Sequence, residues 1–354
     1  GLLCLLQLLP ANAFAAGDTL RAPEEIYQSV PQPAAAQFTV LFTGDINGVE
    51  KGEGGAVGFA KLRALKAERE MGGETLLLDS GNALAGDGGK TIKLMEAAGY
   101  DAAAIGTRDA ALGIERLQEL SARADFPLLC ANWLRDDGEL LFDPYTIVEM
   151  DGVRVGIIGL ISPQIAKDYP EITENCNVYD PSGIANIYHE EMAEKGCDYF
   201  IALTSLGFDG EYTPRQLAKG SPWINMILDG NTQTLLDMGE LVEGTNVIAF
   251  NLPVDFAAVG AFAITAGQSS ITAAPSVLRS EDLAALKEDK AVADLIKAPY
   301  AEPSLEDEPG GASAPSGFHL SSRAVFVVSF LVIVALTVVI VCLMIKKVNT
   351  IKKN

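Results

Sequence analysis

Apolar residues gather in short runs that end in Gly, Asp, Asn or Ser, and this pattern repeats along the middle of the chain. The first run, residues 38–43, is followed by GDING (44–48). Such a run predicts a buried strand that delivers polar side chains at its carboxyl end. Four later runs share this form, and their polar ends are DSGN (79–82), GTRD (106–109), TSLG (204–207) and DGNTQT (229–234). Ligand sites gather at the carboxyl ends of strands in open α/β sheets, so the five ends predict one shared pocket.

Stretches with helical spacing alternate with the apolar runs, and an Asp-Gly pair at 151–152 predicts a β-hairpin. The predicted strands are 38–43, 75–78, 101–105, 127–129, 140–149, 153–160, 198–203, 222–228, 247–252 and 256–265. The predicted helices are 59–69, 90–98, 112–122, 181–195 and 280–296. Alternating strands and helices predict a layered α/β domain.

In order and spacing, the five loops resemble the metal-binding loops of the calcineurin-like metallophosphoesterase superfamily. The resemblance is greatest to the N-terminal domain of the 5′-nucleotidase / 2′,3′-cyclic phosphodiesterase family. That family's loops read Asp-x-His, Gly-Asp, Gly-Asn-His-Glu/Asp, Thr-His-x-Gly and Gly-His-x-His/Gln. Connecting segments such as GGAVGFAKLRAL, MEAAGYDAAAIG and KGCDYFIALTSLG are similar too. The resemblance covers residues 38–267 and implies a sandwich of two mixed β-sheets flanked by helices.

The resemblance also implies where the family's two divalent metals would bind, and most of those positions are substituted. Asp45 and Gln233 match the family's ligands. The substituted positions are Asn47, Ser205 and Asn231 in place of His, Asn82 in place of the metal-bridging Asp, Thr107 in place of Asn, and Arg108 in place of the phosphate-contacting His. The motifs therefore look degenerate, and we assign no catalytic residue and no metal ligand.

The histidine count supports the same expectation without the family. The chain has two histidines, His189 and His319. A dinuclear hydrolase needs imidazole and bridging carboxylates to hold transition metals and acidify bound water. We predict His189 to be a solvated residue on its helix, beside an apolar stripe, and His319 to lie in a stalk. The expectation is therefore a pseudoenzyme with no metal cofactor.

Two other uses of the altered pocket stay open. Arg108 could pair with Asp45 or Asp109 and hold a phosphate bidentately, or it could only neutralise carboxylates or point to solvent. A single Mg²⁺ or Ca²⁺ could bind weakly to oxygen donors on Asp45, Asn82, Asn231 and Gln233.

The substituted metal-binding loops leave three possible functions. The first is a degenerate phosphoesterase domain that acts as a binding or interaction module. The alternatives are an active metal-dependent phosphohydrolase of nucleotides or phosphodiesters with atypical ligands, and a structural surface domain without a ligand.

The ends of the chain predict membrane attachment. Residues 324–345 are an apolar stretch long enough to span a bilayer, and Lys residues follow it, which places the tail in the cytoplasm. We expect a type I plasma-membrane protein with its large domain outside. The predicted parts are a signal peptide truncated at its N-terminus (1–15), a disordered lead-in (16–37), the phosphoesterase-like domain (38–275), a helical extension (276–301), a flexible stalk (302–323), the transmembrane helix (324–345) and a basic tail (346–354).

Charge and cysteine content narrow the expected partners. The net charge is −21, which argues against nucleic-acid binding because that requires clustered Lys and Arg. The expected partners are the membrane and a protein, nucleotide or phosphate ligand whose identity is open. Cys130, Cys176 and Cys197 allow at most one disulfide, and the pairing stays open.

Overall fold

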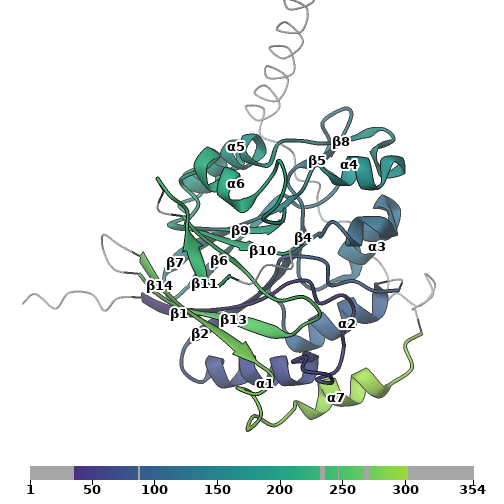
Figure 1. Cartoon of the computed structure of the whole chain (residues 1–354), viewed down its shortest axis with the longest axis vertical. Helices are drawn as coiled ribbons and strands as arrows, with labels where there is room; N and C mark the ends of the chain where they lie inside the picture. The colour runs from purple at the N-terminus through teal and green to yellow at the C-terminus, as the bar shows by residue number, and fades with distance from the viewer. Residues whose placement is uncertain (1–35, 87, 232–235, 246, 267–270, 302–354) are drawn as a thin grey trace, which may run out of the picture. The chain divides into compact units, whose positions relative to one another are not determined.

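The computed structural model describes residues 36–86, 88–231, 236–245, 247–266 and 271–301 (Figure 1). The predicted signal peptide, stalk, transmembrane helix and basic tail, and all but the end of the predicted lead-in, lie outside these residues. Across the described ranges, no helix is both long enough and apolar enough to cross a bilayer. The first strand begins at Ala36, two residues before the predicted start of the domain.

One mixed sheet is built around the first strand. Its strands, in spatial order, are β14 (Ile271–Arg279), β13 (Ala258–Ala266), β1 (Ala36–Thr43), β2 (Glu74–Asp79), β3 (Ala102–Ala104) and β4 (Leu128–Leu129). Strands β1 to β4 run parallel, whereas β13 pairs antiparallel with β1 and with β14. The parallel strands therefore bring three of the predicted polar ends to one edge of this sheet.

A second mixed sheet supplies the other two polar ends. In spatial order its strands are β11 (Leu236–Leu241), β12 (Ile248–Asn251), β10 (Met226–Asp229), β9 (Tyr199–Ser205), β7 (Val153–Ile161) and β6 (Tyr145–Met150). The predicted hairpin joins β6 to β7, and Asp151 and Gly152 have the positive φ values, 48° and 80°, that its tight turn needs. Strand β5 (Trp133–Arg135) pairs separately with β8 (Cys176–Val178).

Helices cover the outer face of each sheet, as Figure 1 shows. Those packed on the first sheet are α1 (Phe59–Glu70), α2 (Gly89–Ala98), α3 (Ile114–Arg123) and α7 (Lys290–Lys297). Those on the second sheet are α5 (Pro181–Glu194) and α6 (Pro214–Gly220). The short helices are α4 (Ile165–Asp168), η1 (Asp109–Leu112) and η2 (Pro170–Thr173). The two-sheet sandwich that the resemblance implies is therefore present.

Alternation along the strands separates the core into layers. In β1, Val40 and Phe42 pack between the two sheets, whereas Leu41 points toward the helices of the first sheet. Successive side chains of a strand face opposite ways, so one apolar run can fill both layers. This is why the sequence shows continuous apolar runs here rather than strict alternation with polar residues.

The helix predicted over 280–296 is shorter in the structure. Ser276–Arg279 extend β14, which is paired with β13 up to Arg279. The chain then turns, because Asp282 accepts a hydrogen bond from the Arg279 amide at 2.8 Å. Helix α7 begins only after Asp289, whose carboxylate accepts from Val292 N at 3.0 Å and caps it.

His189 also departs from its prediction. Its ring is half-buried and stacks on Trp223, with centroids 4.2 Å apart, and meets the edge of Phe200 at 5.1 Å. Burial lowers the pKa of this histidine. The aromatic side chains that cover it come from β9 and from the segment before β10, which helix periodicity alone could not reveal. Cys130, Cys176 and Cys197 are all free thiols.

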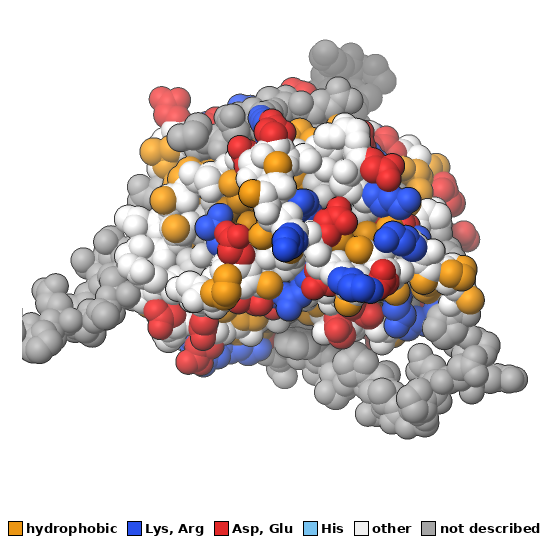
Figure 2. Space-filling model, turned by 90° about the horizontal axis from the view of Figure 1, so that it is seen from below, with side chains coloured by type: hydrophobic (Ala, Val, Ile, Leu, Met, Phe, Trp, Pro, Cys, Tyr) orange, Lys and Arg blue, Asp and Glu red, His pale blue; other side chains and the backbone are white. Residues whose placement is uncertain are grey.

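Charges of both signs are mixed on the face formed by α1 and α7. Figure 2 shows Lys and Arg interspersed with Asp and Glu there. Some basic side chains form ion pairs with nearby acids: Lys66 pairs with Asp101 at 2.9 Å, and Lys90 pairs with Glu50 at 2.6 Å.

The corrected start of α7 can be tested with two alanine substitutions. Asp289→Ala should lower the free energy of unfolding by about 1 kcal/mol, because the helix loses its capping acceptor. Ser280→Ala, at the start predicted from sequence, should change it little. Urea denaturation of both variants measures the difference, and equal effects would contradict the assigned helix start.

Candidate functional site

The loops after the five strand ends hold an unusual backbone. Four of the predicted site residues have left-handed conformations, with φ of 50° at Asp45, 52° at Asn47, 60° at Asn82 and 64° at Asn231. Asp and Asn tolerate this region better than other non-glycine residues, and such conformations persist where surrounding contacts enforce them. The loops therefore present these side chains in a defined arrangement.

Asp45 lies at the centre of the site and is 1% exposed. Its Oδ1 accepts a hydrogen bond from Asn82 Nδ2 at 2.7 Å, and its Oδ2 accepts from the Asn231 amide at 2.9 Å. One carboxylate thus joins the loops after β1, β2 and β10. A buried carboxylate without such donors would carry a large desolvation cost.

The orientation of the Asn82 amide follows from its two neighbours. Its Oδ1 accepts from the Arg108 amide at 2.8 Å, while its Nδ2 faces the Asp45 carboxylate. Reversing the amide would turn an oxygen toward the carboxylate and an NH₂ group toward a backbone N–H, so both contacts would become repulsive. Gly106 leaves room for this side chain, because a Cβ there would lie 2.2 Å from Asn82 Oδ1.

Ser205 joins the fourth strand end to this network. It is fully buried, and its Oγ accepts from the Thr107 amide at 3.0 Å and from Asn82 Nδ2 at 3.4 Å. The structure therefore brings together Asp45, Asn82, Thr107, Ser205 and Asn231, as predicted from the sequence. Gln233 lies outside the described residues.

Two further buried carboxylates support the loops from beneath. Asp109 accepts from the amides of Asn82, Gly106 and Leu84 at 2.8, 2.8 and 3.0 Å, and burial raises its pKa to about 6. Asp229 is similarly held by Thr204 and two backbone amides, and burial raises its pKa to about 8. These groups shape the loops, and their oxygens are used within the protein.

Arg108 lies at the rim, with its side chain 48% exposed. Its Nη1 donates to Asn47 Oδ1 at 2.5 Å and lies 4.0 Å from Asp45 Oδ1. Asn47 is held in turn by its Nδ2, which donates to Asp255 Oδ1 at 2.9 Å. Of the two pairings considered from the sequence, the one with Asp45 is therefore present as a long ion pair.

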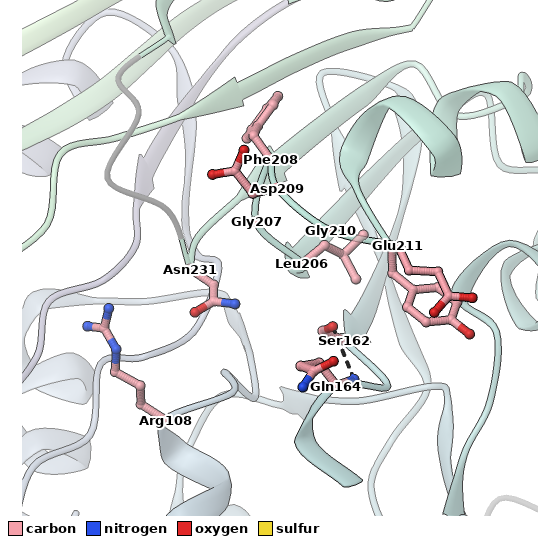
Figure 3. A pocket seen from close by; sticks show the side chains of 11 residues that line it. Arg108, Ser162, Gln164, Leu206, Gly207, Phe208, Asp209, Gly210, Glu211 and Asn231 are labelled. Carbon is pink, nitrogen blue, oxygen red and sulfur yellow. Dashed lines mark hydrogen bonds between the residues drawn. The ribbon is translucent and has the colours of Figure 1, made fainter. Parts of the chain in front are cut away.

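A pocket of about 390 Å³ opens beside this network (Figure 3). Arg108 and Asn231 line one part of it, and Ser162, Gln164 and residues 206–212 line the rest. Sequence reasoning did not single out this wall or Asp255. One sequence signal for this wall was available. Gly207 and Gly210 follow the strand end at Thr204 and Ser205 and indicate a loop there.

The donor set does not fit a pair of transition-metal ions. Asp45 is joined there mainly by amides and hydroxyls, which bind such metals weakly. The nearby carboxylates of Asp109, Asp229 and Asp255 accept hydrogen bonds from protein groups. Across the described ranges, no group of three or more His, Cys, Asp or Glu side chains could hold a metal. In addition, Asp45 Oδ1 already accepts a hydrogen bond from Asn82 Nδ2 at 2.7 Å.

Comparisons with known proteins agree with this architecture. No protein-family model matches the chain. The chain is 30% identical over 242 residues to a 5′-nucleotidase of Vibrio cholerae, covering 61% of this chain and 43% of that protein. It is 29% identical over 248 residues to protein UshA of Escherichia coli K12, covering 62% and 45%. The chain thus spans less than half the length of these relatives.

A solved structure shows the same fold. The calcineurin-like phosphoesterase YfkN from Bacillus subtilis superposes with a TM-score of 0.64 at 22% identity. The match covers 75% of this chain and 96% of that one.

Replacing Asp109 tests its role beneath the loops. Asp109→Asn leaves one backbone N–H facing an NH₂ group and should cost about 1–3 kcal/mol of stability. The pKa of Asp109 is raised to about 6 in the folded protein, so its stabilising contribution is fully present below pH 4 and is lost as the pH rises through 6.

The stability difference between wild type and Asp109→Asn should therefore be largest near pH 4 and smaller at pH 7. Urea unfolding at both pH values measures it, with the exposed Asp125→Asn as the control. A difference that grows with pH would contradict this description of Asp109.

Proposed function

The chain belongs to the 5′-nucleotidase family of the calcineurin-like metallophosphoesterase superfamily, and from this premise we propose that it is a binding module without the family's metal chemistry. The support is that residues at positions resembling the family's metal-binding loops are joined by hydrogen bonds between protein groups. The module would recognise a phosphorylated ligand or partner and would not hydrolyse it.

The bond between Asn82 Nδ2 and Asp45 Oδ1, 2.7 Å long, carries this proposal. A carboxylate at position 82 would repel Asp45 unless one of the two took up a proton or a cation lay between them. An amide instead donates a hydrogen to Asp45 and satisfies its charge in part. The amide of Asn231 and the guanidinium of Arg108 supply the remaining compensation.

Arg108 provides the feature that favours a phosphorylated ligand. Its Nη1 is used by Asn47, but across the described residues its Nε and Nη2 make no hydrogen bond. The side chain lines the pocket (Figure 3). A half-exposed guanidinium with free donors matches the oxygens of a phosphoryl group.

We further propose that the module is displayed on the outer side of a plasma membrane. The support is the sequence alone: residues 324–345 form a largely apolar stretch without a charged side chain, and four Lys residues lie in the nine residues that follow. Both segments lie outside the described residues.

Substituting Asn82 with Asp tests the role of the hydrogen bond from Asn82 to Asp45. Asn82→Asp should lower the free energy of unfolding by about 3 kcal/mol, because it removes a donor and places two buried carboxylates side by side. Added Mn²⁺ should then raise the melting temperature of Asn82→Asp but leave that of the wild type unchanged.

Asn132→Asp is the matched control, since Asn132 is equally buried and its Nδ2 donates to the carbonyls of Ile161 and Tyr179 at 2.8 and 2.9 Å. It should be destabilised without responding to Mn²⁺. The fourfold variant with Asn47→His, Asn82→Asp, Ser205→His and Asn231→His is expected to bind Mn²⁺ and serves as the positive control. Stabilisation of the wild type by Mn²⁺ would contradict the proposal.

Phosphate binding should depend on Arg108. Isothermal titration of inorganic phosphate into the 354-residue chain, in a maltoside detergent, should show weak binding that Arg108→Gln reduces by about tenfold. Arg154→Gln removes an exposed cation elsewhere and should have no effect. Binding that is absent in the wild type would favour the alternative of a structural domain without a ligand.

A further inference from the structure

The pocket carries charges of both signs on different parts of its wall. Figure 3 shows Arg108 on one side of the pocket and Glu211 on the other, with Asp209 on the loop between Leu206 and Tyr212. Both carboxylates are exposed. The pocket is therefore electrically dipolar, with its cation beside the Asp45 network and its anions on the loop after β9.

These carboxylates have no direct partner in the described part of the protein. Neither Asp209 nor Glu211 makes a hydrogen bond or ion pair with any described residue. The nearby Arg215 is instead committed to Glu240 through two short contacts, 2.6 and 2.7 Å. The charge of Asp209 acts on Arg215 without direct contact, so a cation that entered the pocket would find two carboxylates that no described side chain contacts directly.

An aromatic ring lies among the same acids. Tyr212 is half-buried at the pocket wall and is shared with an adjoining cavity of about 310 Å³, which is also lined by Asp180. Burial raises the pKa of Tyr212, and the charges of Glu211 and Asp180 raise it further. Aromatic faces next to carboxylates attract ammonium groups through cation–π and ionic interactions.

The acidic loop is held in place by its neighbours. The amides of Leu206 and Gly207 donate to the carboxylate of Asp229 at 2.9 and 3.0 Å. The guanidinium of Arg215 covers the ring of Phe208, 5.1 Å from its centroid. These contacts fix residues 206–208, directly before Asp209, which reduces the conformational freedom that this part of the loop loses when a ligand binds.

We propose that the ligand of this pocket carries an ammonium group as well as a phosphoryl group, as a phosphorylated amino alcohol does. The phosphoryl group pairs with Arg108, and the ammonium group lies against Tyr212 between Asp209 and Glu211. This inference rests on the proposed function for the phosphoryl half. The ammonium half rests on the acidic, aromatic wall.

Titration of three probes tests the proposal on the 354-residue chain in maltoside detergent. The probes are inorganic phosphate, choline and phosphocholine. Phosphocholine should bind about tenfold more tightly than either half alone, since an exposed ion pair and a cation–π contact each add modestly. The double variant Asp209→Asn/Glu211→Gln should lose this advantage and bind phosphocholine within about twofold of phosphate.

A matched control keeps the net charge equal to that of the double variant. Glu68→Gln/Glu171→Gln removes two exposed acids that lie outside the pocket and should preserve the advantage of phosphocholine. Loss of the advantage in this control would overturn the assignment to Asp209 and Glu211.

The outcomes separate the two proposals. Equal affinity for phosphate and phosphocholine would overturn the ammonium subsite and leave the proposed function standing. Binding of neither would overturn both. A soluble short-chain phosphatidylcholine is titrated as a last probe. If it binds more tightly than phosphocholine, the ligand is a lipid headgroup, and if it binds more weakly, the ligand is a free metabolite. Both results support a ligand with a phosphoryl and an ammonium group.

Discussion

The site depends on how the negative charge of Asp45 is satisfied. This carboxylate is 1% exposed and lies where the loops of both sheets meet, so it must be paired or hydrogen-bonded. It receives the Asn82 side chain at 2.7 Å, the Asn231 amide at 2.9 Å and a long contact with Arg108 at 4.0 Å. These donors link the ends of β1, β2, β3 and β10 into one network.

The backbone and the side chains of the site give different information. The left-handed residues at positions 45, 47, 82 and 231 and the tight packing of Gly106 against Asn82 keep the loops in a defined form. The side chains on this frame are amides and hydroxyls, which hydrogen-bond one another. The fold therefore supports membership of the family, whereas the chemistry of the site has to be argued residue by residue.

Much of this could be predicted from the sequence, because strand ends with Gly, Asp and Asn have strong local signals. The convergence of Asp45, Asn82, Ser205 and Asn231 follows from parallel strands, and these residues lie together in the structure. The end of the domain was harder: β14 contains Pro275, which an edge strand tolerates, and the stretch after Arg279 resembles a helix although Asp282 turns it.

Contacts between distant segments were beyond the reach of the sequence. Asp255 reaches Asn47 across 208 positions, and His189 stacks on a tryptophan that follows it by 34 residues. The acidic residues of the pocket, Asp209 and Glu211, were missed for the same reason. They come to line the same pocket as Arg108 only when the chain folds (Figure 3).

The most direct measurement is the metal content of the purified chain after exposure to Mn²⁺, Zn²⁺ and Fe²⁺ followed by desalting, read by inductively coupled plasma mass spectrometry. The account predicts a metal content near zero, because Asp45 already accepts a hydrogen bond from Asn82 and the other groups around it are weak metal ligands. A stoichiometric metal content would contradict it.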